Sequence, residues 1–192
     1  MKRHLFLYLL AIASCGVNAD WQLNSRDSAV NFISTKKTST SEVHHFKSLS
    51  GSIENNKASV LIDLSSVETN IPIRNERMQS LLFETKSFLL ASISAEIDSA
   101  KLLNMKCGDS ESMSLVLGLD FHGISKQIES EVHIVKLAND SVQVYSQQPI
   151  IIKAEDFGLA KGVEALRNIA NLPVISTAVP VTFNLKFEKL NN

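Results

Sequence analysis

The sequence has few of the residues on which disulfide-bonded or phosphate-binding proteins depend. It contains two cysteines, seven glycines and four prolines among its 192 residues. Cys15 lies in an N-terminal export segment described below, so Cys107 is the only cysteine in the rest of the chain. A single thiol excludes an intramolecular disulfide, and a domain of this length can be stabilised by a hydrophobic core alone. We interpret Cys107 as a free thiol in a turn.

Motifs for catalysis and metal binding are also missing. The chain has no glycine-rich phosphate loop and no G-x-S-x-G elbow, which argues against nucleotide binding and serine hydrolysis. No HxH, HxxxH or CxxC spacing occurs. His44 and His45 are adjacent, so in a strand they point to opposite faces and cannot share one metal ion. We predict no enzymatic activity, no catalytic residue, no metal site and no cofactor.

Charge excludes another class of partner. The formal net charge is −1, and no basic stripe or cluster appears along the chain. Proteins that bind nucleic acid usually carry such a patch to meet the phosphates. We therefore predict no nucleic-acid partner.

Residues 1–19 have the features of an export signal. A short positive stretch with Lys2 and Arg3 precedes an apolar run that is too short to span a bilayer. Cleavage after Ala19 would leave residues 20–192 as one exported, periplasmic domain. The alternative is a bacterial lipobox at residues 12–15, in which Cys15 would be lipidated and become the N-terminus.

Alternating apolar residues dominate the remainder. Met113, Leu115, Leu117, Leu119 and Phe121 occupy every second position, which places them on one face of a strand. The turn that follows has Gly123 as its pivot, and the alternation then resumes from residue 128 to residue 134. This pattern predicts a long antiparallel hairpin with one apolar face.

The same pattern recurs along the chain. A second long apolar stripe lies between Val179 and Phe187, where Pro180 indicates an edge or the first turn of a strand. Further predicted strands cover residues 21–23, 29–33, 45–53, 59–64, 93–97, 141–145 and 150–154. Two segments, 70–83 and 163–170, have helical spacing instead, and Pro72 suits the first turn of the former. We predict an all-β antiparallel barrel of about eight strands with two short helices.

A barrel of this size can hold side chains or one small ligand in its interior. Periodicity alone does not distinguish a filled barrel from a hollow one, nor which stripe faces inward. The candidate lumen residues are Phe32, Phe46, Leu115, Leu117, Leu119, Phe121, Val181, Phe183 and Leu185. Each of them alone would equally suit a packed core.

Several motifs, taken in order, resemble those of the YceI-like proteins. They are the opening strand at 21–23 and 28–32, the helix start at 67–70, the helix at 74–83, the strand and turn at 118–126, and residues 155–159. The resemblance spans essentially the whole chain after the export signal. Two departures concern the barrel mouth: Gln127 stands where the family often has proline, and the segment 162–176 is longer than in many members.

The resemblance implies a lipocalin-like extended antiparallel barrel that holds an isoprenoid-type lipid or a quinone tail in its pore and carries out no reaction. A hydrophobic lipid would be the main partner, with transient membrane or membrane-protein contact, and a dimer is compatible with the sequence. Arg74 and Arg77 are candidates for a headgroup contact, or form a solvated helix face paired with Glu76 or Glu84. The main alternative is an accessory protein of a membrane redox or envelope stress system, without tightly bound lipid.

Overall fold

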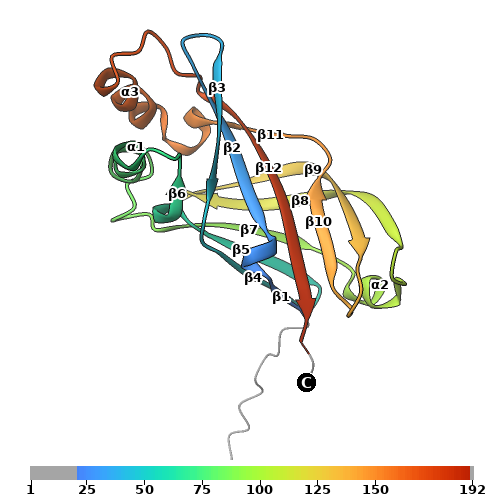
Figure 1. The fold of residues 1–192 in the computed structure, drawn as a ribbon. Coiled ribbons are helices and arrows are strands. Elements are labelled where there is room, and N and C mark those ends of the chain that lie inside the picture. Colours follow the sequence, from blue (N-terminus) through green and yellow to red (C-terminus); the bar gives the residue numbers. More distant parts are fainter. Residues whose placement is uncertain (1–20, 191–192) are drawn as a thin grey trace, which may run out of the picture.

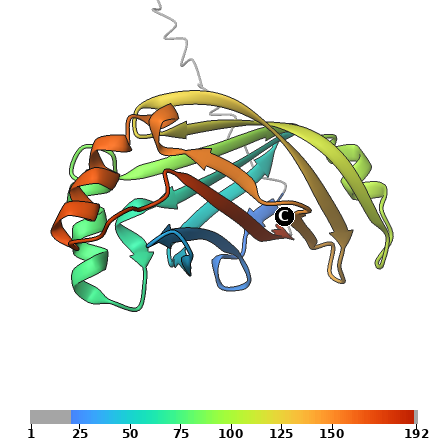
Figure 2. The ribbon, with the colours of Figure 1, turned by 90° about the horizontal axis from the view of Figure 1, so that it is seen from above.

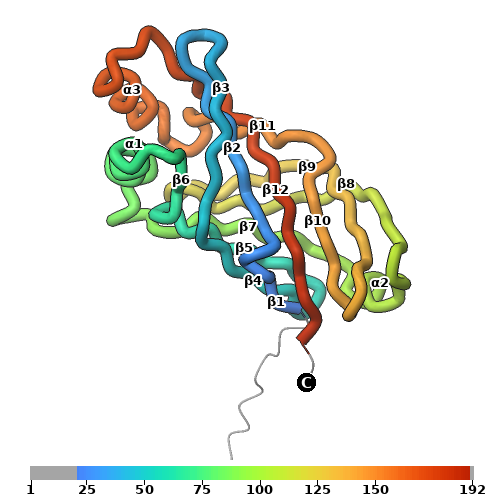
Figure 3. Tube along the Cα trace, viewed as in Figure 1, coloured from blue at the N-terminus to red at the C-terminus, as the bar shows by residue number. Residues whose placement is uncertain are grey.

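A computed structural model describes residues 21–190, and the export signal, Cys15 and the cleavage site predicted above lie outside these residues. The described chain forms one continuous antiparallel sheet that closes into a barrel (Figures 1 and 3). The predicted lipocalin-like all-β barrel is therefore confirmed. The barrel is not regular, because one part of the sheet extends beyond the closed ring.

The described residues contain twelve strands and three α-helices. The strands are β1 (Trp21–Leu23), β2 (Ala29–Lys36), β3 (Thr40–Phe46), β4 (Leu49–Glu54), β5 (Lys57–Asp63), β6 (Val67–Glu68), β7 (Leu90–Glu96), β8 (Ser110–Phe121), β9 (Ile124–Lys136), β10 (Val142–Ser146), β11 (Ile150–Lys153) and β12 (Ala178–Lys189). The helices are α1 (Pro72–Arg77), α2 (Ser99–Asn104) and α3 (Ala160–Ile169), and α1 continues into a π-helical turn, η3 (Met78–Leu82).

Eight strands close the ring, in the order β1, β4, β5, β7, β8, β9, β10 and β12. The short strand β1 joins the two ends, since it pairs with β4 on one side and with β12 on the other. Trp21 is fully buried at this seam, and its indole Nε1 donates to the carbonyl of Asp140 at 3.1 Å. Closure leaves the ring without a free edge at β1.

Strand β12 belongs to two parts of the sheet. Its C-terminal half pairs with β10 and β1 inside the ring, whereas its N-terminal half pairs with β2 and β11. Strands β2, β3 and β6 therefore extend from the ring as a flap. Pro180 lies in the N-terminal half, one residue before the pairing with β2 begins at Val181, so its missing N–H is tolerated.

The β8–β9 hairpin has the predicted form. Phe121 pairs with Ile124 across a two-residue turn, in which His122 has a φ of 53° and Gly123 a φ of 75°. Positive φ at both central positions is the geometry that matches the twist of paired strands. The apolar stripe of β8 faces inward, and Val116 between its members is 53% exposed.

The structure differs from the prediction in one strand and in one additional helix. The single strand predicted over 45–53 is divided at Lys47 and Ser48, because their backbone N–H groups donate to Ser66 instead of continuing a ladder. Helix α2 was not predicted. It begins after Asp98, whose side chain accepts from the backbone N–H of Lys101, a capping contact.

Helices α1 and α3 lie side by side at one end of the barrel, and α2 lies at the other (Figures 1 and 2). Gly162 of α3 is buried against η3. A Cβ at this position would lie 2.6 Å from the Leu81 carbonyl oxygen and 2.8 Å from the Leu82 Cα. The absence of a side chain therefore sets how closely α3 approaches η3.

Substitution Gly162→Ala should destabilise the protein. Alanine normally favours a helix by about 1 kcal/mol over glycine, but here the methyl group meets backbone atoms, and overpacking costs about 1–3 kcal/mol. We expect a net loss of up to about 2 kcal/mol in the free energy of unfolding, measured by urea denaturation. The control Lys161→Ala, at the exposed neighbouring position, should be neutral or stabilising. A Gly162→Ala protein as stable as this control would show that α3 does not depend on the close approach.

Candidate functional site

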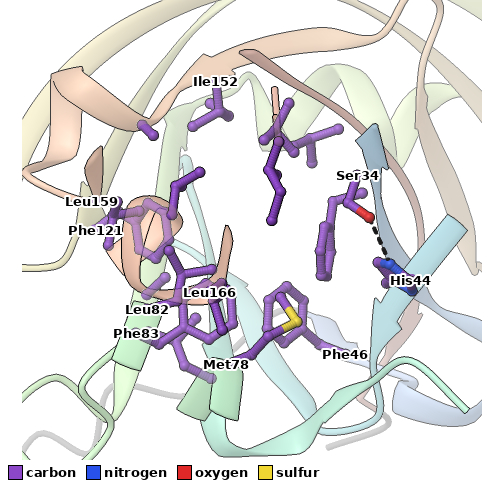
Figure 4. A pocket seen from close by; sticks show the side chains of 18 of the residues that line it. Ser34, His44, Phe46, Met78, Leu82, Phe83, Phe121, Ile152, Leu159 and Leu166 are labelled. Carbon is purple, nitrogen blue, oxygen red and sulfur yellow. Dashed lines mark hydrogen bonds between the residues drawn. The ribbon is translucent and has the colours of Figure 1, made fainter. Parts of the chain in front are cut away.

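A cavity of about 340 Å³ lies between the sheet and the pair α1–α3. Its volume is within the usual range for small-molecule sites, about 300–1,000 Å³. Side chains from β2, β3, β8, β11 and β12 form its walls, and side chains from α1, η3 and α3 cover it (Figure 4). Nearly all of the lining is hydrocarbon.

The sheet wall contains most of the residues predicted to line a lumen. On β8, Leu117 is 6% exposed and lies deep in the wall, while Leu119 and Phe121 are less buried and line the same cavity. The other predicted residues that line it are Phe32, Phe46, Val181 and Phe183. The alternation of each strand explains this placement, because every second side chain points inward.

Leu115 and Leu185 lie elsewhere. They line a second, smaller apolar cavity of about 60 Å³ that is further along the barrel. Ile93, Leu117 and Phe183 line both cavities and so form the partition between them. The interior is thus two apolar compartments separated by a few side chains.

Aromatic rings run in a continuous row along the larger cavity. Phe32 and Phe46 have ring centroids 5.4 Å apart, Phe46 and Phe83 5.8 Å, Phe83 and Phe121 6.0 Å, and Phe121 and Phe157 5.5 Å. These separations are typical of favourable tilted aromatic pairs. Phe32, Phe46, Phe83 and Phe121 line the cavity and give one side of it a stiff apolar surface. Phe157 extends the row but does not line the cavity.

The helical cover was not predicted to line a site. Met78 and Leu82 from η3 and Val163, Leu166 and Ile169 from α3 all face the cavity. Their helical spacing identified an apolar face in the sequence, but it gave no information on what that face would cover. Ile169 is 51% exposed as well as cavity-lining, so it lies where the cavity opens to solvent.

Charged groups gather at the β2–β3 side of the opening. The Glu42 carboxylate pairs with Lys36 Nζ at 2.6 Å and with Arg74 Nη1 at 2.9 Å. The hydrogen bond from Lys36 and, with it, the charge of Arg74 lower the pKa of Glu42 below its usual value. Arg74 also donates to the Thr69 carbonyl at 2.7 Å. Its carboxylate partner is thus Glu42, rather than Glu76 or Glu84.

Arg77 has a different environment from Arg74. Its side chain lines the cavity and, within residues 21–190, makes no ion pair. Both arginines predicted to contact a headgroup therefore line the cavity, but Arg74 is held in a local network and Arg77 is not.

One neutral polar pair interrupts the apolar wall. Ser34 Oγ and His44 Nε2 are 2.9 Å apart, on neighbouring strands β2 and β3 (Figure 4). His44 is 2% exposed, and its ring lies 5.3 Å from that of Phe32. Burial, reinforced by the positive charge of Arg74, lowers the pKa of His44. The imidazole is therefore neutral at pH 7.

The remaining histidines and acids form no metal site within the described residues, where no group of three or more His, Cys, Asp or Glu side chains converges. His122 is held by Glu84 at 3.1 Å and by the Phe157 carbonyl at 3.2 Å. Cys107 is exposed and free. Over residues 21–190, none of the helices has the length and apolar character needed to cross a bilayer.

Comparison with known proteins identifies the architecture. Residues 21–187 match the family model of the YceI-like domain. A solved polyisoprenoid binding domain from Saccharophagus degradans, implicated in plant cell wall breakdown, is 38% identical, with a TM-score of 0.88 over 90% of this chain and 100% of that one.

More distant structures share the fold. BcnA from Burkholderia cenocepacia is 15% identical with a TM-score of 0.67, over 85% of this chain and 98% of its own. A YCEI protein from Campylobacter jejuni is 18% identical with a TM-score of 0.54, over 77% of this chain and 85% of its own. A search of curated proteins found no match.

The lowered pKa of His44 can be measured directly. NMR titration of the His44 ring should give a pKa below the ordinary value of 6.5, because burial disfavours the imidazolium. The unfolded chain then binds a proton that the folded chain does not, so stability should fall as the pH drops from about 6.5 to the folded pKa. The variant His44→Phe should lack this contribution. A measured pKa above 6.5 would contradict the assignment.

Proposed function

This chain belongs to the family of YceI-like domains, and from that membership we propose that it binds an isoprenoid-type lipid or the tail of a quinone within its barrel. The solved relative with 38% identity is a polyisoprenoid binding domain by its own description. The proposed action is passive carriage, with no covalent step and no cofactor beyond the bound lipid. The export signal predicted from the sequence of residues 1–19 is what supports a periplasmic location for this role.

The observation that carries the proposal is the apolar cavity of about 340 Å³ that opens to solvent beside α3. An isoprenoid tail offers almost no hydrogen-bonding group, so its affinity must come from burial. Each buried CH₂ contributes roughly 0.8 kcal/mol, and a five-carbon unit therefore roughly 4 kcal/mol before costs. Micromolar affinity requires about 8 kcal/mol, so a few units suffice after the entropy of ordering is subtracted.

The proposed contacts divide by position along the barrel. Phe32, Phe46, Leu117, Leu119, Phe121, Val181 and Phe183 surround the tail in the larger cavity. Leu115 and Leu185 contact it only where a tail reaches the smaller compartment. Arg77 is positioned to meet an oxygen-bearing headgroup at the wall, whereas the contacts of Arg74 with Glu42 and Thr69 give it a structural role.

A single charge placed on the cavity wall should weaken lipid binding. Leu119→Lys places an ammonium group on the cavity wall opposite Lys126, with which it pairs in register, whereas Val116→Lys places the same group outside, opposite Glu129. We expect farnesol to bind Leu119→Lys at least tenfold more weakly than the wild type, because a buried charge opposes an apolar tail. Binding is measured by displacement of a fluorescent apolar dye.

Val116→Lys is the matched control and should bind as the wild type does. Circular dichroism and the melting temperature establish that both variants are folded. If folded Leu119→Lys retains wild-type affinity, the tail does not occupy this cavity, and the accessory role without tightly bound lipid gains support.

The partition between the compartments should set the length of tail that is accepted. Leu117→Ala removes part of that partition and should shift the preferred prenol toward greater length in a series of geraniol, farnesol and geranylgeraniol. Shortening a buried leucine also costs about 2–5 kcal/mol in stability. The outward Leu61→Ala, at a position 38% exposed, is the control. An unchanged length preference in a folded Leu117→Ala protein would mean that the partition does not limit the length of the bound tail.

A further inference from the structure

Most polar side chains on the cavity wall are already engaged with other protein groups. Lys36, Glu42 and Arg74 are joined in the network described above. The Ser176 hydroxyl donates to the Ala178 carbonyl at 2.9 Å and accepts from the Ala178 N–H at 3.2 Å. Within residues 21–190, the polar groups on the wall with unused hydrogen-bonding capacity are Arg77, the Nε of Arg74, the Nδ1 of His44 and the hydroxyl of Ser34, which is the only neutral hydroxyl among them.

Ser34 Oγ has a single partner among the described residues, the Nε2 atom of His44. A hydroxyl has one donor and two acceptor positions, so one contact leaves two positions free for a ligand. Ser34 lines the cavity, and Figure 4 shows its hydroxyl directed toward His44 at the edge of the wall. The Ser34 hydroxyl can therefore form a hydrogen bond with a polar atom of a ligand in the cavity.

His44 determines whether that hydroxyl donates or accepts. Among residues 21–190, the buried Nδ1 atom of His44 has no hydrogen-bond partner. The tautomer of a neutral histidine is normally fixed by the hydrogen bond that its second nitrogen makes. Because that bond is missing here, neither tautomer is imposed by the protein.

Each tautomer gives Ser34 a different role. With the proton on Nε2, His44 donates to Ser34 Oγ, and the Ser34 O–H is free to donate to a ligand carbonyl. With the proton on Nδ1, Ser34 donates to Nε2, and its oxygen lone pairs are free to accept from a ligand hydroxyl. The Ser34–His44 pair can thus donate to a ligand carbonyl or accept from a ligand hydroxyl.

We propose that Ser34, backed by His44, binds the carbonyl or hydroxyl oxygen of a prenyl-chain ligand whose tail occupies the cavity. This inference rests on the proposed function and specifies the headgroup as neutral. The Ser34–His44 contact joins two uncharged groups, and the cations Lys36 and Arg74 on the same wall are already paired with the Glu42 carboxylate.

Four ligands with the same tail separate the possibilities: farnesol, farnesylacetone, farnesyl diphosphate and the hydrocarbon farnesene. Dissociation constants are measured by dye displacement for the wild type and for Ser34→Ala. We expect Ser34→Ala to weaken the alcohol and the ketone roughly five- to tenfold, as expected for loss of one hydrogen bond, and to leave farnesene unchanged. Unchanged farnesene binding also shows that the variant is folded.

The matched control is Ser41→Ala. The Ser41 hydroxyl bonds to Thr35 Oγ1 at 2.9 Å across the same two strands, but on an exposed surface away from the cavity. This variant should bind all four ligands as the wild type does.

A second readout tests the tautomer. A ketone has no proton to give, so with farnesylacetone bound, ¹⁵N NMR should show His44 protonated on Nε2. A proton on Nδ1 in that complex would overturn the proposal, because Ser34 would then be donating to His44 rather than to the ketone.

The outcomes separate this inference from the function on which it rests. If farnesene and the other ligands all fail to bind the wild type, the cavity is not a lipid site and both proposals fail. If farnesene binds but Ser34→Ala leaves the alcohol and ketone unchanged, only the headgroup assignment is wrong. Preference of the wild type for the diphosphate, lost in Arg77→Gln but not in Ser34→Ala, would likewise overturn it in favour of an anionic headgroup.

Discussion

This structure depends on one constraint: the apolar side chains around the larger cavity face one another but do not fill the space between them. The larger cavity has a volume of about 340 Å³. Because the cavity opens to solvent, its apolar lining stays in contact with water and forgoes roughly 25 cal/mol for each Å² that a packed core would bury. A sequence that maintains such a space gives up much of its core, and binding of an apolar chain recovers that burial.

The fold holds this space open through a few shared elements. Strand β12 serves both the closed ring and the β2–β3 flap, so the wall of the cavity is continuous with the barrel. Because Gly162 has no side chain, α3 packs closely against η3. Together, α3 and η3 cover the larger cavity. At the other end, Leu117 and Phe183 separate the larger compartment from the smaller one. The length and shape of the space follow from these contacts between distant parts of the chain.

Much of this architecture is visible in the sequence, because a period of two residues assigns side chains to faces. The stripes ending at Phe121 and Phe187 predicted two long strands that the structure contains. What periodicity could not supply is long-range placement. It grouped Leu185 with Val181, although the two residues lie in different compartments. It also missed the helical cover, the aromatic contact of Phe157 and the pairing of Arg74 with Glu42, since these depend on how distant segments meet.

A hollow barrel that carries the apolar tail of a lipid should retain that lipid when the protein is purified. Native mass spectrometry of protein purified without detergent tests this most directly, with the bound species extracted into organic solvent and identified by mass. We predict a complex heavier than the polypeptide, which releases a prenyl-chain lipid with a carbonyl or hydroxyl function. A bare polypeptide that also takes up no added farnesol or farnesene would contradict it.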